Sequence, residues 1–284
     1  LDDFRVIGLP TNSFYSKSTG NLDVLTNWGD QTDGSGTNPT DFVTDGYTYY
    51  IRNNATPTIG ANWTVSGTGS KVVVEAVSSS NFSVPSGFSF TGTIDVESGA
   101  TLTLTNTVVP TLGTLGATST VVYGAASSQT ITATTYGNLT ASTTATVAIA
   151  HVLGGNVVVG GILNIVGTTG PARITIGANT LTMNGTIAGT GTLTGSTTSN
   201  IVIGGTGALG TLNFTSGAAR SNNLTINRTS SGTATLGGIT FTVSGALALT
   251  NGTLNLTSSL VLSSTVSQSN GTITYISGTP TVLY

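Results

Sequence analysis

Short runs in which apolar and polar residues alternate recur along this chain of 284 residues, and they restrict the structures it can form. The runs are rich in Thr, Val, Ile and Leu, and they are bounded by Gly, Asn and Ser. Period-two alternation gives a strand one apolar face and one polar face. We therefore predict an all-β protein. The clearest runs are 101–106, 129–134, 172–177, 200–203, 222–227, 240–244, 253–257 and 271–275.

Two β-architectures fit these runs. Short strands separated by a few small polar residues are typical of a parallel β-helix, whose coils stack about 4.8 Å apart around an aliphatic column. An antiparallel sandwich is the alternative, because Asn184-Gly185, Asn251-Gly252 and Asn270-Gly271 are the dipeptides of hairpin turns. We predict the parallel β-helix, a β-solenoid, and the bias of parallel connections predicts a right-handed coil.

A longer self-similarity overlies the strands. The segments 118–125 and 137–140 are echoed by 198–205 and 222–225. An offset of about 80 residues is too long for one solenoid coil, so we interpret it as a duplication of several stacked coils.

Acidic residues are confined to the start of the chain, since none follows Glu97. Beyond that point the only Arg, Lys or His side chains are Arg173, Arg220, Arg228 and His151. Paired-carboxylate and Ser-His-Asp chemistry has no reagents there, and we predict that the protein is not an enzyme. The net charge is −3 with only 6% charged residues, which gives no electrostatic footprint for nucleic acid.

The composition divides the chain into two parts. Residues 1–97 hold all the acidic residues, both tryptophans and most Phe and Tyr, and we predict an N-terminal cap with the first coils there. Residues 98–284 form a low-charge solenoid body rich in Thr, Gly and Asn. No apolar run is long enough for a membrane helix, so no membrane span is expected. The start at Leu1 instead of Met suggests either a processed, exported protein or an excised fragment, and we expect export.

One acidic loop is a candidate metal site. Asp30 and Asp33 lie in a Gly-rich loop with Asp41 and Asp45 nearby, and calcium prefers such oxygen ligands. The spacing is not that of an EF-hand, and Asp and Gly also favour turns for local reasons. We favour the turn and keep calcium as the only cofactor considered.

Aromatic residues of the first part are a candidate glycan platform. Trp28, Trp63, Tyr47, Tyr49 and Tyr50 could stack on the sugar rings of a polysaccharide ligand, and of these we select Trp28, Trp63 and Tyr49 as the platform. The alternative, which we prefer, is that they plug the open end of the solenoid, as a capping repeat requires. His151 has no Cys, Asp or Glu close in sequence, and we expect a surface or turn residue there.

Repeated Thr-X-Thr runs raise a third class of function, because flat threonine arrays on a β-solenoid are the surface of several ice-binding proteins. Here the runs are uneven and mixed with Asn and Ser. Threonine is also a good strand former that keeps an uncharged surface soluble, which is the interpretation we favour.

Two longer segments carry a family resemblance. The sequence 14–29, and then 189–217 followed by 222–229, resembles repetitive secreted surface proteins of Bacteroidota. Such proteins are adhesin-like cargo of the type IX secretion system. The resemblance implies an extracellular or cell-surface β-solenoid, ordinarily followed by a C-terminal sorting domain.

The predicted terminal strands suggest how such a solenoid would work. Segments 272–276 and 281–284 would leave an unpaired edge, which segment 1–9 of a second copy could cover. We therefore predict a secreted structural protein, the subunit of a bacterial surface filament that assembles end to end. A stalk or binding domain of a larger adhesin and an ice-binding protein are the alternatives. The assembly residues would be Leu1, Phe4, Val6, Ile7, Ile276, Val282, Leu283 and Tyr284.

Overall fold

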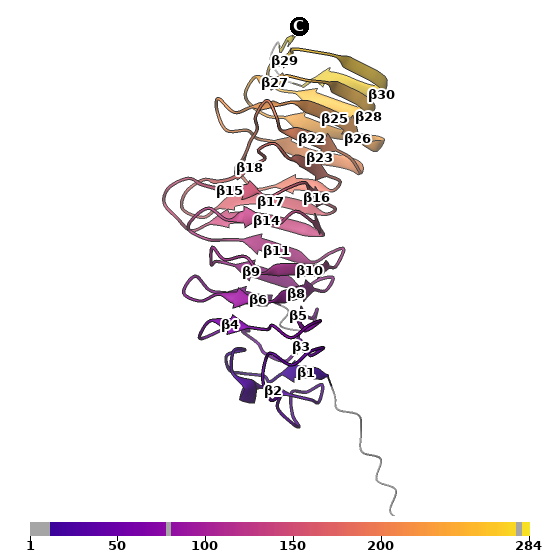
Figure 1. The fold of residues 1–284 in the computed structure, drawn as a ribbon. Helices are drawn as coiled ribbons and strands as arrows, with labels where there is room; N and C mark the ends of the chain where they lie inside the picture. Colours follow the sequence, from indigo (N-terminus) through magenta and orange to yellow (C-terminus); the bar gives the residue numbers. More distant parts are fainter. Residues whose placement is uncertain (1–11, 78–80, 277–279) are drawn as a thin grey trace, which may run out of the picture.

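The chain folds into a β-solenoid. The computed structural model describes residues 12–77, 81–276 and 280–284, and Figure 1 shows their strands stacked along one axis. Among the residues described, every strand pair is parallel except β1 with β2, which confirms the prediction of an all-β parallel β-helix over an antiparallel sandwich. Besides the strands, this part of the chain contains one 3-10 turn, η1 (Leu25–Asn27). Within the described residues, no helix is long and apolar enough to cross a membrane.

Three sheets begin within the first hundred residues. The first has the order β10-β8-β5-β3-β1-β2 and contains β1 (Ser13–Ser16), β2 (Trp28–Gly29), β3 (Thr48–Ile51), β5 (Lys71–Val74), β8 (Thr93–Val96) and β10 (Thr111–Leu115). The second has the order β20-β17-β14-β11-β9-β6 and contains β6 (Asn81–Val84), β9 (Thr101–Leu104), β11 (Thr120–Tyr123), β14 (Asn138–Thr143), β17 (Ile162–Gly167) and β20 (Thr186–Ala188). A small third sheet pairs β4 (Trp63–Thr64) with β7 (Phe90–Thr91).

Three more sheets complete the C-terminal half. The largest contains β13 (Thr135–Tyr136), β16 (Val157–Val159), β19 (Thr180–Met183), β22 (Asn200–Ile203), β23 (Thr206–Leu212), β25 (Asn223–Asn227), β26 (Thr229–Leu236), β28 (Leu247–Leu256) and β30 (Val266–Tyr275). Another contains β12 (Thr130–Ile131), β15 (Ile149–Leu153), β18 (Ala172–Thr175) and β21 (Thr192–Thr194). The last contains β24 (Arg220–Ser221), β27 (Phe241–Val243), β29 (Leu260–Leu262) and β31 (Val282–Leu283).

The coils differ in length. Val121 pairs with Leu139 and Leu139 pairs with Leu163, so one coil takes 18 residues and the next takes 24. Within a coil the chain visits three faces in turn, as in β14, β15 and β16, and β17 then returns to the first face. The variable length is absorbed in the turns, which leaves the paired strands in register.

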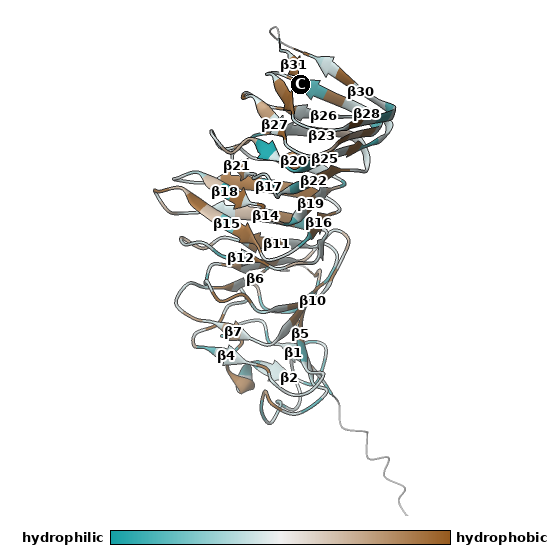
Figure 2. Cartoon of the chain, turned by 45° about the horizontal axis from the view of Figure 1, so that its top comes forward, coloured by the Kyte–Doolittle hydropathy of each residue, from teal (hydrophilic) through white to brown (hydrophobic). Residues whose placement is uncertain are grey.

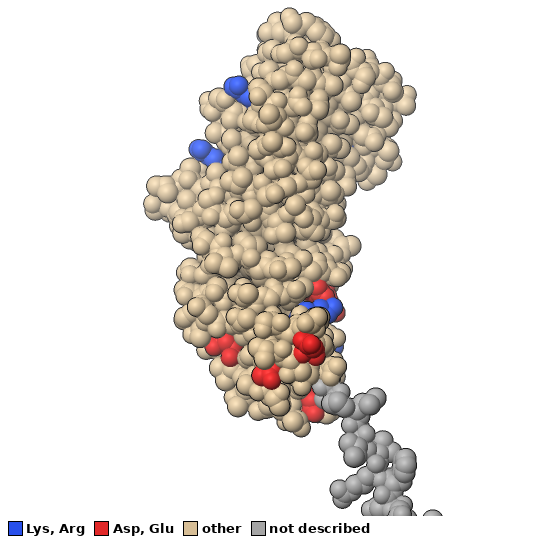
Figure 3. Space-filling view, in the orientation of Figure 1, with Lys and Arg blue, Asp and Glu red and all other residues tan. Residues whose placement is uncertain are grey.

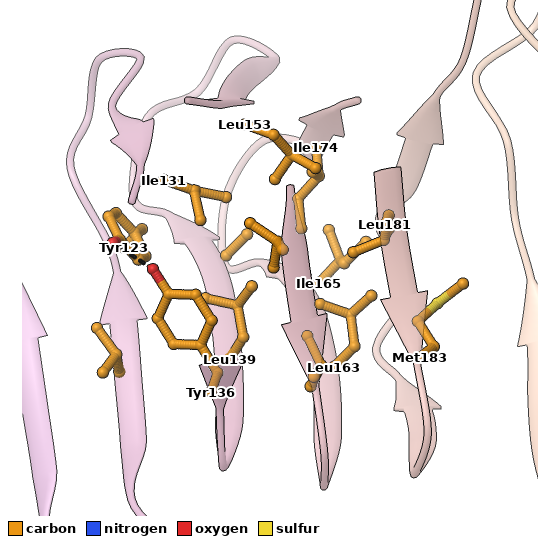
Figure 4. Close-up of a cluster of buried hydrophobic side chains, with 14 of the residues drawn as sticks. Tyr123, Ile131, Tyr136, Leu139, Leu153, Leu163, Ile165, Ile174, Leu181 and Met183 are labelled. Carbon is orange, nitrogen blue, oxygen red and sulfur yellow. Dashed lines mark hydrogen bonds between the residues drawn. The ribbon is translucent and has the colours of Figure 1, made fainter. Parts of the chain in front are cut away.

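The core is a column of aliphatic side chains inside the coils. Figure 2 shows hydrophobic strand segments along the whole length, and Figure 4 shows leucines and isoleucines of successive coils one above another. Leu102, Val121, Leu139 and Leu163 are aligned in register and fully buried. Each such side chain contributes about 1.5–3 kcal/mol by leaving water. With few charges, stability rests on this column and on the backbone ladders.

Two tyrosines add a closed hydrogen-bond ring to the core. The Tyr136 hydroxyl donates to the Thr132 carbonyl at 2.8 Å, and the Thr132 N–H donates to the Tyr123 oxygen at 3.0 Å. The two hydroxyls lie 2.8 Å apart, so Tyr123 is the donor to Tyr136 (Figure 4). Burial raises the pKa of both tyrosines, as expected for phenols that leave water without a counterion.

Two sequence interpretations were wrong. Asn251-Gly252 and Asn270-Gly271 are not hairpin turns, because they lie inside β28 and β30 and stack directly on each other. At these points the strand bends from one face to the next: the first half of β28 pairs with β25 and the second half with β26. The offset of about 80 residues is also not a whole number of coils. It relates β11 and β14 of one face to β22 and β25 of another.

Arg228 closes a corner of the C-terminal coils. It follows β25, is completely buried, and takes part in no ion pair among the described residues. Its guanidinium instead donates to backbone carbonyls of two lower coils: Nε to Gly207 at 2.8 Å, Nη2 to Gly185 at 3.1 Å and to Thr206, and Nη1 to Gly204. The planar fork of five donors suits this arrangement, which links three successive coils.

Candidate functional site

The charged side chains gather on the first coils. Figure 3 shows the acidic groups there, next to basic ones on one side of the solenoid. Arg52 Nε lies 2.8 Å from Glu75 Oε2, and Lys71 Nζ lies 2.7 Å from Asp95 Oδ2. Both pairs lie on the outer face of the first sheet. The first joins the residues that follow β3 and β5, and the second joins β5 to β8. Burial is the main cause that raises the pKa of Glu75, whereas the bond to Asp95 raises that of Lys71.

A pocket of about 290 Å³ opens beside these pairs. Its lining includes Tyr50, Lys71, Asp95 and Glu97. Asp95 also accepts the Thr114 N–H at 2.7 Å, which holds the chain where β10 breaks its register with β8. The pocket thus combines an aromatic ring, an ion pair and an exposed carboxylate.

The three aromatic residues predicted as a glycan platform are not on the surface. Trp28 and Tyr49 are completely buried and Trp63 is 2% exposed. Trp28 and Trp63 pack at 5.8 Å between ring centroids, and Trp28 Nε1 donates to the Leu22 carbonyl at 2.8 Å. Their rings fill the inside of the first coils, so none can stack on a sugar. This placement agrees with the preferred alternative, a plug.

The acidic loop is built from local turns. Asp30 Oδ1 accepts the Thr37 N–H at 3.0 Å, and Asp33 Oδ1 accepts the Ser35 N–H at 2.9 Å. The Ser35 hydroxyl and N–H lower the pKa of Asp33. Among the described residues, no three His, Cys, Asp or Glu side chains come together as a metal cluster. These contacts give both aspartates a role in the turn, and calcium binding stays a prediction.

His151 was expected to be a surface or turn residue, and this prediction was wrong. Its side chain is completely buried on β15. Its Nε2 lies 2.9 Å from the Ser142 carbonyl, which can only accept, and its Nδ1 accepts the Gln129 N–H at 3.2 Å. The ring is therefore neutral with its proton on Nε2. The Gln129 side chain extends the network by donating to the carbonyls of Leu104 and Asn106.

This network predicts a pH-dependent stability. Burial lowers the pKa of His151 below its ordinary value of 6.5, so the unfolded chain binds a proton that the folded chain excludes. The contribution of neutral His151 to the free energy of unfolding is fully present above pH 6.5. It is lost as the pH falls from 6.5 toward the pKa of His151 in the folded chain. Chemical denaturation of the wild type between pH 7.5 and about 5.5 should show a declining free energy of unfolding. In His151→Gln the decline should vanish, because this is the only histidine. Equal slopes would contradict the prediction.

The C-terminal coil has an open edge. β30 pairs with β28 on one side and has no partner on the other among the described residues. Tyr275, Ile276, Leu283 and Tyr284 are 49%, 54%, 51% and 86% exposed, whereas Val282 packs partly against the core. The four predicted assembly residues of this end thus lie together at the open coil. The other four, Leu1, Phe4, Val6 and Ile7, lie outside the described residues.

Threonines form a short array near this edge. Thr233, Thr253 and Thr272 are aligned in one column, and Thr235, Asn255 and Thr274 are aligned in a second. The Thr253 and Thr272 hydroxyls lie 3.0 Å apart. The second column continues to Thr211 on β23 but is interrupted by Asn255. Ice binding, which a thermal hysteresis measurement tests, stays an untested alternative.

Comparison with protein-family models, with curated proteins and with solved structures finds no match for this chain.

Proposed function

We propose that this chain is an extracellular structural protein that assembles end to end, with the open edge of β30 receiving a second copy. The observation that carries the proposal is this edge: a strand of ten residues, flanked by exposed apolar side chains, whose outer side has no partner among the described residues. Unpaired strand edges add strands from other chains. Location on a bacterial surface and export through the type IX route rest on the sequence resemblance.

The two ends of the solenoid differ in a way that supports a polar filament. At the first coil β2 turns back antiparallel to β1, and Leu22 and Trp28 are completely buried there. At the last coil β30 follows the parallel ladder and remains open. The acceptor is thus the β30 end, and we assign the donor role to segment 1–9 of the next copy.

The surface suits close packing between copies. Only 6% of the residues are charged, and the acidic ones all precede residue 98. Copies that meet at the β30 end would therefore experience little charge repulsion. Continuous backbone ladders would then run from one copy into the next and resist unfolding.

A single substitution tests the edge. The Ile276 N–H donates to the Leu256 carbonyl on β28, so by strand alternation the Tyr275 N–H faces the free edge. Tyr275→Pro removes this outward donor and keeps the bonds to β28, and assembly measured by light scattering should disappear. The matched control is Tyr275→Thr, which keeps the donor and should still assemble. Assembly of Tyr275→Pro at the wild-type concentration would refute the edge as acceptor. Deletion of residues 1–9 should likewise abolish assembly if that segment is the donor.

A further inference from the structure

We propose that the pocket beside Tyr50 binds one neutral pyranose ring of a glycan, a function separate from assembly. Tyr50 is half-buried on the outer face of the first sheet, unlike the buried Tyr49. It lies on β3, far along the solenoid from the open β30 edge (Figure 1). Four features of the pocket support this function: an interrupted aromatic ladder, a polar rim, a charge preference and a rigid frame.

The first feature is an aromatic ladder on the outer face of the first sheet. Tyr15, Tyr50, Val73 and Asp95 occupy the same outward position on successive strands β1, β3, β5 and β8. The rings of Tyr15 and Tyr50 stack at 5.0 Å between centroids and at 17° between planes. At Val73 the ladder loses its ring, and the pocket lies there, lined by Tyr50, Val73 and Asp95. A flat ring in this gap would occupy the next rung, about 4.8 Å further along.

The second feature is the polar rim of the pocket. The Lys71 ammonium uses one donor for Asp95 and keeps others, while Asp95 and the exposed Glu97 offer carboxylate oxygens. A pyranose has an apolar C–H face for the tyrosine ring and equatorial hydroxyls that both donate and accept. A hollow of about 290 Å³ is large enough for a single sugar unit and small for a folded partner.

The third feature is the net negative charge of the pocket lining. Lys71 is matched by Asp95, and Glu97 adds a further negative charge to the lining. Uronic acids and sulfated sugars would therefore meet repulsion, because like charges at close range disfavour binding. The pocket chemistry selects neutral sugars.

The fourth feature is the rigidity of the pocket walls. Arg52 lies over the Tyr15 ring, 5.5 Å from its centroid, and is held by Glu75. On the other side, Asp95 fits against Gly113, where an added Cβ would lie 2.1 Å from the carboxylate oxygen. The pocket walls are thus fixed before a ligand arrives, which lowers the entropic cost of binding.

Binding is tested on both the wild-type chain and Tyr275→Pro, and the same affinity is expected for both whether or not either assembles, because the pocket lies far from the β30 edge. Cellohexaose, laminarihexaose and xylohexaose are titrated by calorimetry, with hexagalacturonate as the charged counterpart. At least one neutral hexasaccharide should bind with a Kd of about 1 mM or lower, and hexagalacturonate should bind more weakly.

Two variants locate the site. Val73→Tyr adds the missing rung and should weaken binding by at least about tenfold, as should Tyr50→Ala, which removes the stacking ring. The matched control is Val122→Tyr, the same change on the outer face of the second sheet between Thr103 and Thr140, which should leave binding unchanged. The proposal is overturned if none of the three neutral probes binds, if hexagalacturonate binds best, or if a folded Val73→Tyr protein binds like the wild type.

Discussion

Replacing Arg228 with methionine should lower the free energy of unfolding of the C-terminal coils by about 4 kcal/mol. Methionine keeps much of the volume but donates no hydrogen bond. The buried carbonyl of Gly204 and the part-buried carbonyls of Gly185, Thr206 and Gly207 then lose their guanidinium partner. Each buried carbonyl left unsatisfied costs about 1–3 kcal/mol, part of which relaxation recovers. Hydrogen exchange of the coils from β19 to β28 measures the effect locally.

The control for this change is Arg220→Met. Arg220 is exposed, and its guanidinium donates one hydrogen bond, to the Gly217 carbonyl at 2.9 Å. Its replacement should alter stability by no more than about 0.5 kcal/mol. Similar losses in both variants would mean that Arg228 does not link the coils as described.

A second large loss of stability is expected when Gly205, in the same corner as Arg228, is replaced by alanine. Its φ is +79°, and an added Cβ would lie 1.7 Å from the Asn184 carbonyl oxygen, so the backbone of two coils must separate. Gly205→Ala should cost about 4 kcal/mol through left-handed strain and the clash together. Gly238 has a similar φ of +71° with no atom within 4 Å of its added Cβ.

The comparison of the two glycines separates the two causes. Gly238→Ala should cost only about 1 kcal/mol, the strain of the left-handed backbone. Thermal and urea denaturation of both variants give the difference. If both lose the same stability, close stacking at the Gly205 corner contributes nothing beyond its backbone conformation.

The strands could be predicted from sequence because alternation is a local property. The predicted run 200–203 is β22 itself, and 101–106 and 172–177 contain β9 and β18 with a turn residue or two beyond them. The runs 253–257 and 271–275 match only the second halves of β28 and β30. There Asn-Gly bends a strand that stays paired, because the coil above bends at the same place.

The candidate site was only partly predictable. The sequence drew attention to the charges and aromatic rings of the first part of the chain, but Trp28, Trp63 and Tyr49, selected there as the platform, are buried. Tyr49 shares its phase with Ile51 and points inward, whereas Tyr50 shares its phase with Thr48 and points outward. That alternation was visible in the sequence. The pocket itself was not, because it depends on Tyr15, Val73 and Asp95 aligning across coils of unequal length.

The buried polar groups were missed for a related reason. His151 has no partner nearby in the chain, and its surroundings come from Gln129 on the coil below and from Ser142. Arg228 likewise finds its carbonyls 21 to 43 residues away. Such contacts follow from the stacking register, which variable turn lengths hide in the sequence.

Assembly is the central claim, and negative-stain electron microscopy of the purified chain over a concentration series tests it most directly. We expect unbranched fibres one solenoid wide that lengthen as the concentration rises, because each added copy restores the same open β30 edge. Short rods of uniform length at every concentration would contradict the claim.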